Sequence, residues 1–431
     1  MNFRNLTAIA FVACFCVSNL FAQDASDSEN SDWPQILGAN RNGVLADSVT
    51  LGWQKTPDVI WETEIGEGFS GPVIVDDELI LFHRPDGARG KFLIVEKFNV
   101  TDGRSVWKQK IASQYRGAMD GDAGPKATPV IQDGFVYCYG PDGELACLEF
   151  DTGKIVWELN ARKKFNASEG YFGCGSSPLV VDGKVLLNVG GRKGASVVAF
   201  DASDGEVLWK AIDDEASYSS PIVVEHDGKK MAVFLTRTRF VGLDVDSGKV
   251  LFSNSFGKRG PTAVASMPVA FGSKLFANAA YRVGATVVDL KNLKTAGDEI
   301  APDWSSENAF ASHYGTPVFF NGHFYGTSGR EDMRNGSFRC LEASTGDVKW
   351  DQDSFPVAHT LLIGEQLLVL DYEGKLSLIE PSPAGFQQIQ SATIFNGPTR
   401  SIPAFSDGKL FFRSNAKSRV GKLVAIDVSE K

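Results

Sequence analysis

The sequence is poor in the motifs on which metal sites and nucleophilic catalysis depend. Its 431 residues include 5 histidines and 6 cysteines. No HExxH motif, no CxxC pair and no GxSxG nucleophile elbow occurs. These absences argue against a zinc site and against a serine hydrolase that uses such an elbow.

Positive charge is also in short supply. Lysine and arginine number 43 against 53 aspartates and glutamates, which gives a net charge of −10 at pH 7. This balance argues against a nucleic acid or an anionic membrane surface as the main partner. Beyond residue 22 the chain also lacks an apolar run long enough for a transmembrane segment.

The N-terminus has the pattern of a processing signal. Arg4 precedes an apolar stretch from Leu6 to Phe21, and cleavage is expected after Ala22. Residues 1–22 are therefore predicted to be a signal peptide, which indicates an exported protein, periplasmic or extracellular. Lipid attachment at Cys14 is the alternative. Residues 23–32 are acidic and serine-rich, and we expect a disordered linker there.

Two cysteines are predicted to be neighbours in a hairpin. Cys138 and Cys147 flank Asp142-Gly143 in "FVYCYGPDGELACLEF". If Asp142 and Gly143 form a two-residue turn, the two cysteines face each other directly across the strands. They would then form a disulfide in an oxidising compartment or pack as two small apolar side chains.

A short pattern, seen in "FDASDGEVLWK" at residues 200–210, recurs along the chain. In each copy an aromatic residue stands four positions after a turn glycine. The glycines are Gly103, Gly153, Gly205, Gly248 and Gly346, and the aromatics are Trp107, Trp157, Trp209, Phe252 and Trp350. The glycine indicates a turn with positive φ between two strands. We expect the repeated tryptophans, together with Trp61 near the start, to pack between neighbouring units.

A second pattern opens each repeat, with a small residue two positions before a proline and an apolar run after it. The prolines are Pro72, Pro129, Pro178, Pro221, Pro268, Pro317 and Pro403, and Leu361 takes the same place once. A period of about 40–50 residues with several short strands per unit is typical of a β-propeller. The third repeat shows the four strands best, at 178–181, 185–189, 196–200 and 207–210.

The two ends of the chain predict how the ring closes. The last repeat stops after its third strand, whereas residues 58–64, with Trp61, are a fourth strand without the first three. We therefore predict one all-β domain over residues 33–431, an eight-bladed propeller of four-stranded antiparallel blades. The N-terminal strand would complete the last blade and leave no unpaired edge.

At these repeats the sequence resembles the tryptophan-docking repeat of the pyrroloquinoline quinone (PQQ) propellers, best at 149–157 and 201–209. "DWPQILGANRNG" also resembles the opening of secreted bacterial PQQ-like propellers. Two blades depart from the pattern, because "VVDLKNLKTAGDEI" and "SLIEPSPAGFQQI" contain no tryptophan. The resemblance implies one of two functions. Quinoprotein alcohol dehydrogenases hold PQQ and calcium, whereas the propeller subunit of the outer-membrane β-barrel assembly machinery is a non-catalytic docking protein.

The loops before the prolines are expected on one face of the ring, where propellers bind ligands. Candidate cofactor-binding residues are Trp304, Glu307, Asn308 and His313, and candidate calcium ligands are Asp120 and Asp122. The alternative is that the candidate cofactor residues lie in an ordinary inter-blade loop and that the two aspartates lie in a solvated acidic loop. Cys174 has no base near it in the sequence, which favours a packing role.

The dehydrogenase branch carries a vicinal cysteine pair and a complete metal set, and this sequence has neither. We therefore predict an exported, monomeric binding or scaffold propeller that is not an enzyme and needs no cofactor. Its partner would be a protein or a cell-envelope component. A PQQ- and calcium-dependent dehydrogenase with an atypical site is the main alternative, and a hydrolytic propeller is another.

Overall fold

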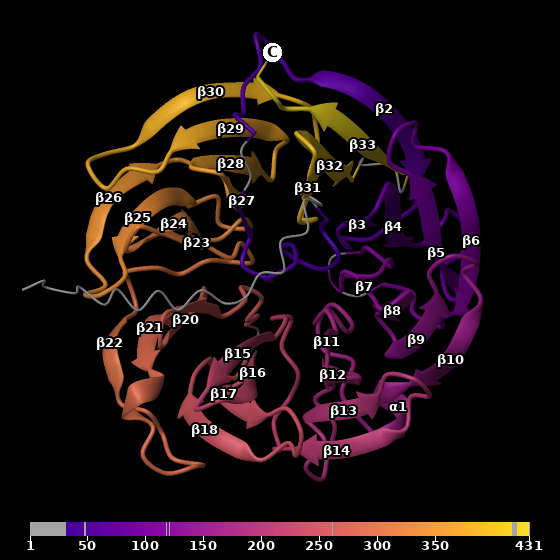
Figure 1. Cartoon of the computed structure of the whole chain (residues 1–431), viewed down its shortest axis with the longest axis vertical. Helices are drawn as coiled ribbons and strands as arrows, with labels where there is room; N and C mark the ends of the chain where they lie inside the picture. Colours follow the sequence, from indigo (N-terminus) through magenta and orange to yellow (C-terminus); the bar gives the residue numbers. More distant parts are fainter. Residues whose placement is uncertain are drawn as a thin grey trace, which may run out of the picture.

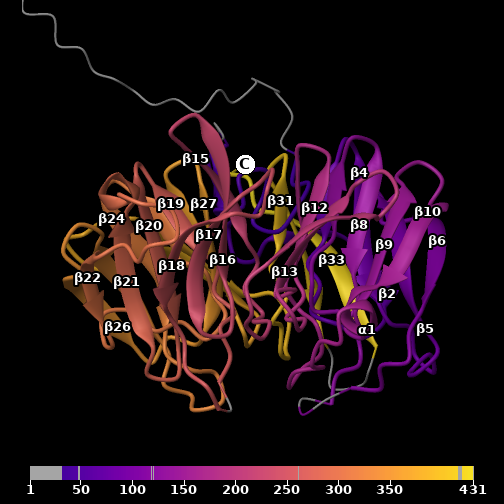
Figure 2. The ribbon, with the colours of Figure 1, turned by 90° about the horizontal axis from the view of Figure 1, so that it is seen from below.

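The computed structural model describes residues 32–46, 49–117, 119, 121–260, 262–415 and 420–430. The predicted signal peptide and nearly all of the linker lie outside these ranges. The described strands form eight sheets arranged as a ring around a central axis (Figure 1). Seen from the edge, the strands of each blade run between the two faces of the ring (Figure 2). The prediction of an eight-bladed all-β propeller is confirmed.

In the first four blades the strands follow one another in sequence from the axis outward. Blade one consists of β3 (Val73–Val75), β4 (Glu78–His83), β5 (Phe92–Asn99) and β6 (Ser105–Ala112). Blade two consists of β7 (Val130–Gln132), β8 (Phe135–Tyr139), β9 (Glu144–Glu149) and β10 (Ile155–Asn160), followed by the short helix α1 (Ala161–Lys164). Blade three consists of β11 (Leu179–Val181), β12 (Lys184–Asn188), β13 (Val197–Asp201) and β14 (Val207–Ala211). Blade four consists of β15 (Ile222–His226), β16 (Lys229–Leu235), β17 (Arg239–Asp244) and β18 (Val250–Ser255).

The other four blades repeat this plan, and the last two also take in strands from the N-terminal part of the chain. Blade five consists of β19 (Val269–Phe271), β20 (Lys274–Ala279), β21 (Gly284–Asp289) and β22 (Pro302–Ser306), with the 3₁₀ turn η1 (Leu290–Asn292) before β22. Blade six consists of β23 (Val318–Phe320), β24 (His323–Ser328), β25 (Ser337–Glu342) and β26 (Val348–Asp353). Blade seven consists of β27 (Ala358–Ile363), β28 (Gln366–Asp371), β29 (Lys375–Glu380) and β30 (Gln387–Thr393), joined at the axis by β1 (Val44–Leu45). Blade eight consists of β31 (Ala404–Ser406), β32 (Lys409–Ser414), β33 (Gly421–Asp427) and β2 (Asp58–Ile65).

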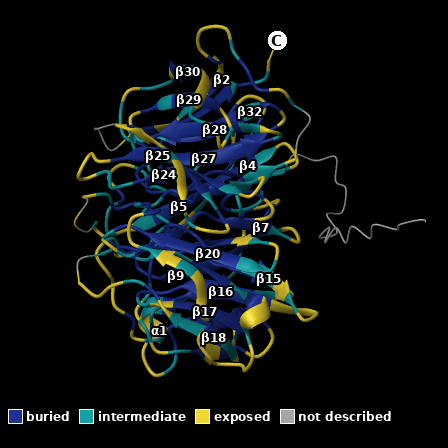
Figure 3. Cartoon of the chain, turned by 90° about the vertical axis from the view of Figure 1, so that its left-hand side faces the viewer, coloured by how far each residue is buried: buried dark blue, intermediate teal, exposed yellow. Residues whose placement is uncertain are grey.

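The ring closes as the sequence predicted. β2 pairs antiparallel with β33 and becomes the outer strand of blade eight. The four strands of blade three also lie within a residue of their predicted positions. Burial follows the distance from the axis. The inner strands β27 and β28 are almost entirely buried (Figure 3), whereas the outer strand β26 is half-buried or exposed along its length.

At five of the joints between neighbouring blades, an indole ring packs on a turn glycine of the next blade. In the described part of the chain, six fourth-strand tryptophans each donate the indole N–H to a backbone carbonyl of the next blade. The pairs are Trp61 to Val100 (2.7 Å), Trp107 to Phe150 (3.1 Å), Trp157 to Ala202 (2.9 Å), Trp209 to Val245 (3.0 Å), Trp304 to Ala343 (3.0 Å) and Trp350 to Ser382 (2.8 Å). Under the Trp209 ring lies Gly248, whose φ is +69° and where a Cβ atom would overlap the indole. We call this contact the indole–glycine joint.

Blade five was predicted to lack a docking tryptophan, and this was wrong. Trp304 lies on β22, the fourth strand of that blade, and packs against Gly346 of blade six. Residues 290–300, which include η1, lengthen the connection between the third and fourth strands and move the tryptophan out of the regular spacing. Blade seven does lack the indole, and Gln390 lies at the corresponding register after the bulge in β30.

The opening stretch of the described chain plugs the channel. Trp33 exchanges two backbone hydrogen bonds with Ile74 of blade one, each 2.8 Å long. Fully buried Arg41 donates to the carbonyls of Pro178 (3.0 Å) and Pro221 (2.7 Å), in blades three and four, and burial lowers its pKa to about 9. β1 then runs parallel to β27 of blade seven.

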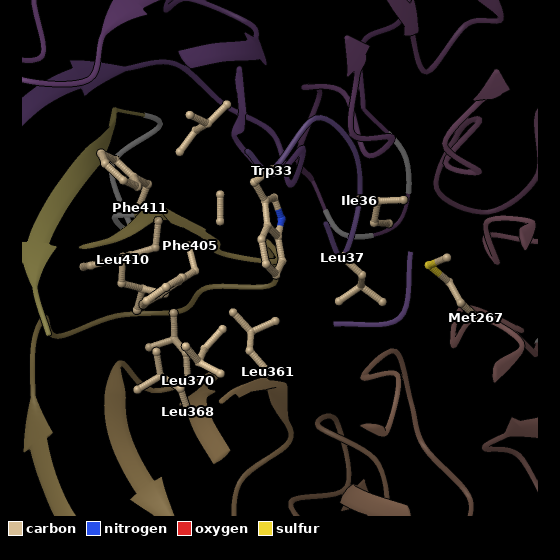
Figure 4. Close-up of a cluster of buried hydrophobic side chains, with 14 of the residues drawn as sticks. Trp33, Ile36, Leu37, Met267, Leu361, Leu368, Leu370, Phe405, Leu410 and Phe411 are labelled. Carbon is tan, nitrogen blue, oxygen red and sulfur yellow. The ribbon is translucent and has the colours of Figure 1, made fainter. Parts of the chain in front are cut away.

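The plug carries apolar side chains into the centre of the ring. Figure 1 shows this segment, in indigo, passing through the middle of the molecule. The largest buried apolar cluster includes Trp33, Ile36 and Leu37 of the plug. Figure 4 shows Trp33 next to Phe405 and Leu361. The channel is therefore closed by the protein's own N-terminal segment, which the sequence did not predict.

The same segment continues into the seam between blades seven and eight. The Gln390 side chain accepts from the Trp53 backbone N–H (3.0 Å) and donates to its carbonyl (2.8 Å). Gln366 binds the backbone of Leu51 in the same way, at 2.7 and 3.4 Å. Residues 51–53 thus occupy the seam where the indole of blade seven is missing.

The predicted pairing of the two hairpin cysteines is wrong by one residue. Cys138 is opposite Ala146, and Cys147 is opposite Tyr137. A hydrogen bond between Gly140 N–H and the Glu144 carbonyl (2.7 Å) closes a loop one residue longer than a two-residue turn. Because a one-residue shift reverses the face of a side chain, Cys138 and Cys147 lie in different apolar clusters and both are free thiols.

We expect Gly248→Ala to destabilise the protein more than Gly228→Ala. Both glycines lie in blade four at nearly the same φ, +69° and +70°, but only at Gly248 does a Cβ meet an indole ring. The matched variant should lose about 1 kcal/mol from backbone strain, and Gly248→Ala about 2 kcal/mol more from the clash. Urea unfolding followed by tryptophan fluorescence measures both. Equal losses would show that the joint does not need the missing side chain.

We also expect Gln390→Ala to weaken the seam. The change removes both hydrogen bonds to Trp53, so the free energy of unfolding should fall by about 1–3 kcal/mol. Gln352→Ala on β26 is the control, because that side chain bonds only to its sequence neighbour Asp353. Thermal unfolding of the two variants compares them, and similar midpoints would contradict a role of Gln390 in the seam.

Candidate binding cup at the channel mouth

The loops that precede the prolines surround one cavity on a single face of the ring, as the sequence predicted. The cavity has a volume of about 410 Å³, which is within the usual range for ligand pockets. The residues immediately before the prolines that line it are Thr128, Ser177, Ser220, Met267, Thr316 and Ile402. Ile36 of the plug also contributes to its lining. We call this cavity the cup.

An arc of buried hydroxyl groups lines the cup. Backbone N–H groups of Gly71, Thr128, Ser177 and Met267 donate to the hydroxyl of the next pre-proline residue or its counterpart. The acceptors are, in order, Thr128 (3.0 Å), Ser177 (2.8 Å), Ser220 (2.9 Å) and Thr316 (2.9 Å). A hydroxyl both donates and accepts, and among the described residues these four are seen only as acceptors. The arc therefore links neighbouring blades, and its O–H groups have no acceptor within the described structure.

Two ion pairs bring equal numbers of positive and negative charges to the cup. Arg400 donates from Nη2 and Nε to the two carboxylate oxygens of Glu331, at 2.6 and 2.8 Å. Lys126 donates to Asp122 at 2.7 Å. Burial alone would lower the pKa of Arg400, but the Glu331 carboxylate outweighs it and raises the pKa. Burial alone would raise the pKa of Asp122, but Lys126 outweighs it and lowers the pKa.

A hydrogen-bonded pair stands beside the Arg400 ion pair. The Tyr281 hydroxyl lies 3.0 Å from Nε2 of His313, and the Glu331 backbone N–H donates to Nδ1 at 3.3 Å. Because Nδ1 accepts, the neutral imidazole carries its proton on Nε2 and donates it to Tyr281. Burial lowers the pKa of His313, which favours this neutral form. His313 therefore orients Tyr281 and is not placed to take its proton.

Aromatic side chains from separate loops form much of the wall. The half-buried ones are Phe69, Phe172, Tyr218, Tyr281 and Tyr314. Lys126 and Arg400 both lie over the Phe69 ring, with 4.4 and 5.2 Å to its centroid. The Tyr314 hydroxyl is buried and has no hydrogen-bond partner within the described residues. The cup thus combines apolar ring surface with a limited set of polar atoms.

The predicted cofactor residues do not come together. Trp304 is committed to the joint between blades five and six, while Glu307 and Asn308 line a second cavity of about 360 Å³. Of this set, His313 lines the cup. Asp122 is bound by Lys126 and by backbone N–H groups, and Asp120 lies outside the described residues.

The sequence interpretation missed the most polar residues of the cup. Arg400 lies in the loop before Pro403, so the same rule that pointed to the other pre-proline loops would have found it. Glu331 and Tyr281 come from connections between second and third strands, which that rule did not include. Burial of Cys174 raises its pKa to about 12, which agrees with a packing role.

A family model described as outer membrane protein assembly factor BamB matches residues 91–352, more than half of the chain. The chain belongs to this family of PQQ-like propellers. BamB of Yersinia pestis is 26% identical over 247 residues, which are 52% of this chain and 57% of that protein. Quinohemoprotein alcohol dehydrogenase ADH-IIG of Pseudomonas putida is 29% identical over 144 residues, 32% of this chain and 18% of that one. The chain therefore spans less than two thirds of the length of either relative.

Solved structures of PQQ-like propellers show the same fold. BamB from Moraxella catarrhalis has a TM-score of 0.62 at 15% identity, covering 86% of this chain and 98% of that one. Quinohemoprotein alcohol dehydrogenase from Comamonas testosteroni has a TM-score of 0.64, also at 15% identity, covering 94% and 82%. Both branches of the family thus match in architecture, and the fold alone does not separate them. Over the described residues there is no helix of the length and apolarity that crossing a membrane requires.

We expect buried His359 to make the protein less stable in mild acid. Burial lowers its pKa to about 4, and its Nε2 donates to the Arg400 carbonyl at 3.0 Å. The unfolded chain binds this proton near pH 6.5 and the folded chain does not, so stability falls as the pH drops from 6.5 towards 4. The loss approaches about 1.4 kcal/mol per pH unit for this one group.

The measurement is the thermal midpoint between pH 7 and 4.5 for the parent protein and His359→Gln, which keeps an N–H donor but does not titrate. The variant should lose less stability over this range. His226→Gln, at the tip of the β15–β16 hairpin, is the control and should follow the parent protein. Parallel curves for all three would show that His359 does not contribute.

Proposed function

We propose that the protein is an exported, monomeric propeller that binds a partner or ligand in its cup and is not an enzyme. One observation carries this proposal. The charged groups of the cup are already paired, whereas its arc hydroxyls have no acceptor within the described structure and its aromatic rings are only half-buried. A surface of this kind suits recognition, because binding does not need to break an internal ion pair.

The side chains of the cup do not form a catalytic set. His313 is held as the neutral donor to Tyr281, and His359 donates to a backbone carbonyl. Neither histidine is therefore placed as a base beside a nucleophile, which covalent or acid–base catalysis requires. Within the described ranges, moreover, histidine, cysteine, aspartate and glutamate never gather in a group of three that could hold a metal ion.

The donor set of the cup does not fit PQQ with calcium. PQQ is a polycarboxylate and needs unpaired cations, but Asp122 and Glu331 already neutralise Lys126 and Arg400. Calcium needs carboxylate oxygens, but arginines hold both Glu331 and Asp332. The residue types that the cofactor would need are thus present, but they are engaged with each other.

The relatives support a location in the cell envelope. The matched family model and several relatives are named as outer membrane protein assembly factors, which is consistent with the N-terminal signal that the sequence predicts. We propose a protein or another envelope component as the partner. The dehydrogenase relatives keep the PQQ-dependent alternative open to experiment.

A titration of the purified mature chain with PQQ tests the proposal. Thermal stability and quinone absorbance are read with calcium and with a chelator. We expect no saturable shift at PQQ concentrations well above micromolar, because the cup offers no unpaired cation to its carboxylates.

A saturable stabilisation that needs calcium would contradict the proposal and favour the dehydrogenase. In that case Glu331→Gln, which removes a carboxylate of the cup, should abolish the effect. Asp351→Asn is the matched control, since Asp351 pairs with Arg339 on the outer side of blade six.

A further inference from the structure

We propose that the cup binds a neutral carbohydrate, with one sugar ring seated between its aromatic wall and its arc of hydroxyls. This inference rests on the proposed binding function and adds the chemical class of the ligand. Three properties of the cup lead to it, namely its charge balance, its aromatic wall and its mixture of donors and acceptors.

The charge balance favours a ligand without net charge. The cations Lys126 and Arg400 are matched by Asp122 and Glu331, and Asp332 is held by Arg330. An anionic or cationic ligand would have to compete with these partners, and removing one member of a buried pair leaves the other charge uncompensated. A neutral ligand can bind beside the pairs and leave them intact.

The aromatic wall favours a ligand with flat faces of C–H bonds. Phe69, Phe172, Tyr218, Tyr281 and Tyr314 come from different loops and are all half-buried, so each has ring surface that a ligand can still cover. The face of an aromatic ring is negative, and the C–H bonds on the face of a pyranose carry partial positive charge. A sugar ring therefore suits this wall better than a charged head group does.

The polar atoms exclude a purely apolar ligand. A hydrocarbon in the cup would give no acceptor to the O–H groups of Ser177, Ser220 and Thr316, and each O–H group left without an acceptor costs about 1–3 kcal/mol. Sugar hydroxyls both donate and accept. They can accept from this arc while donating to the Glu331 carboxylate, which has lone pairs beyond those used by Arg400.

A peptide fits the cup less well than a sugar. Extended peptides are recognised mainly by adding a strand to an open sheet edge. The channel edge of β27 already pairs with β1, and the edge of β3 is bridged by Trp33. These two inner edges are therefore taken by the plug, and side-chain hydroxyls and aromatic rings remain as the recognition elements of the cup.

The test is calorimetric titration of the purified mature chain with three neutral probes, cellopentaose, maltopentaose and chitopentaose. We expect at least one to bind with a Kd of about 1 mM or tighter. Tyr281→Phe should weaken that binding by about 3- to 10-fold, since it removes a single neutral hydrogen bond to the ligand.

Tyr325→Phe is the matched control, because Tyr325 lies in β24 against Trp350 and not in the cup. Its affinity should equal that of the parent protein. Tyr218→Phe gives a second variant on the cup wall and should also weaken binding.

Three results would overturn the inference. They are no binding of any probe at about 10 mM, an affinity unchanged in both Tyr281→Phe and Tyr218→Phe, or preferential binding of a charged sugar or a peptide. If neither the sugars nor PQQ bind, the carbohydrate inference is contradicted and the proposal of a non-enzymatic binding protein is kept. If PQQ binds in the presence of calcium, the proposed function itself is contradicted.

Discussion

The ring depends on the contact between an indole of one blade and a turn glycine of the next. A four-stranded sheet cannot bury both faces alone, so each blade is stable only when its neighbours cover it. At each joint the indole supplies apolar area and one hydrogen bond, and the bare glycine lets the turn approach the ring face. Where the indole is missing, another contact fills the place, as residues 51–53 do beside Gln390.

The sequence was sufficient to predict the fold because the repeated glycine and proline, present in five and in seven of the eight repeats, are tied to backbone geometry. It failed where local length changed. The extra residues before Trp304 moved this tryptophan out of the regular spacing of the repeat. One additional loop residue between Cys138 and Cys147 placed their side chains on opposite faces of the sheet. The plug was not predicted, because residues 33–45 have no repeat pattern and gain their structure from several blades at once.

The position of the cup could be predicted, but its chemistry could not. Pre-proline loops point to one face as a consequence of blade topology, which the repeat reveals. Whether a charged side chain in such a loop is available depends on partners far away in sequence, as with Glu331 and Arg400. Only the spatial pairing of Glu331 with Arg400 shows that these charged groups of the cavity already neutralise each other.

The strand that completes the ring also dictates when the ring can form. β2 (58–65) is synthesised early, yet its partner β33 (421–427) is made almost last. Contacts this distant in sequence form slowly, because the whole intervening chain must be brought into place first. Until then β2 lacks the strand it pairs with, and an unpaired strand is prone to aggregate. The topology therefore leaves β2 exposed for almost the whole of synthesis.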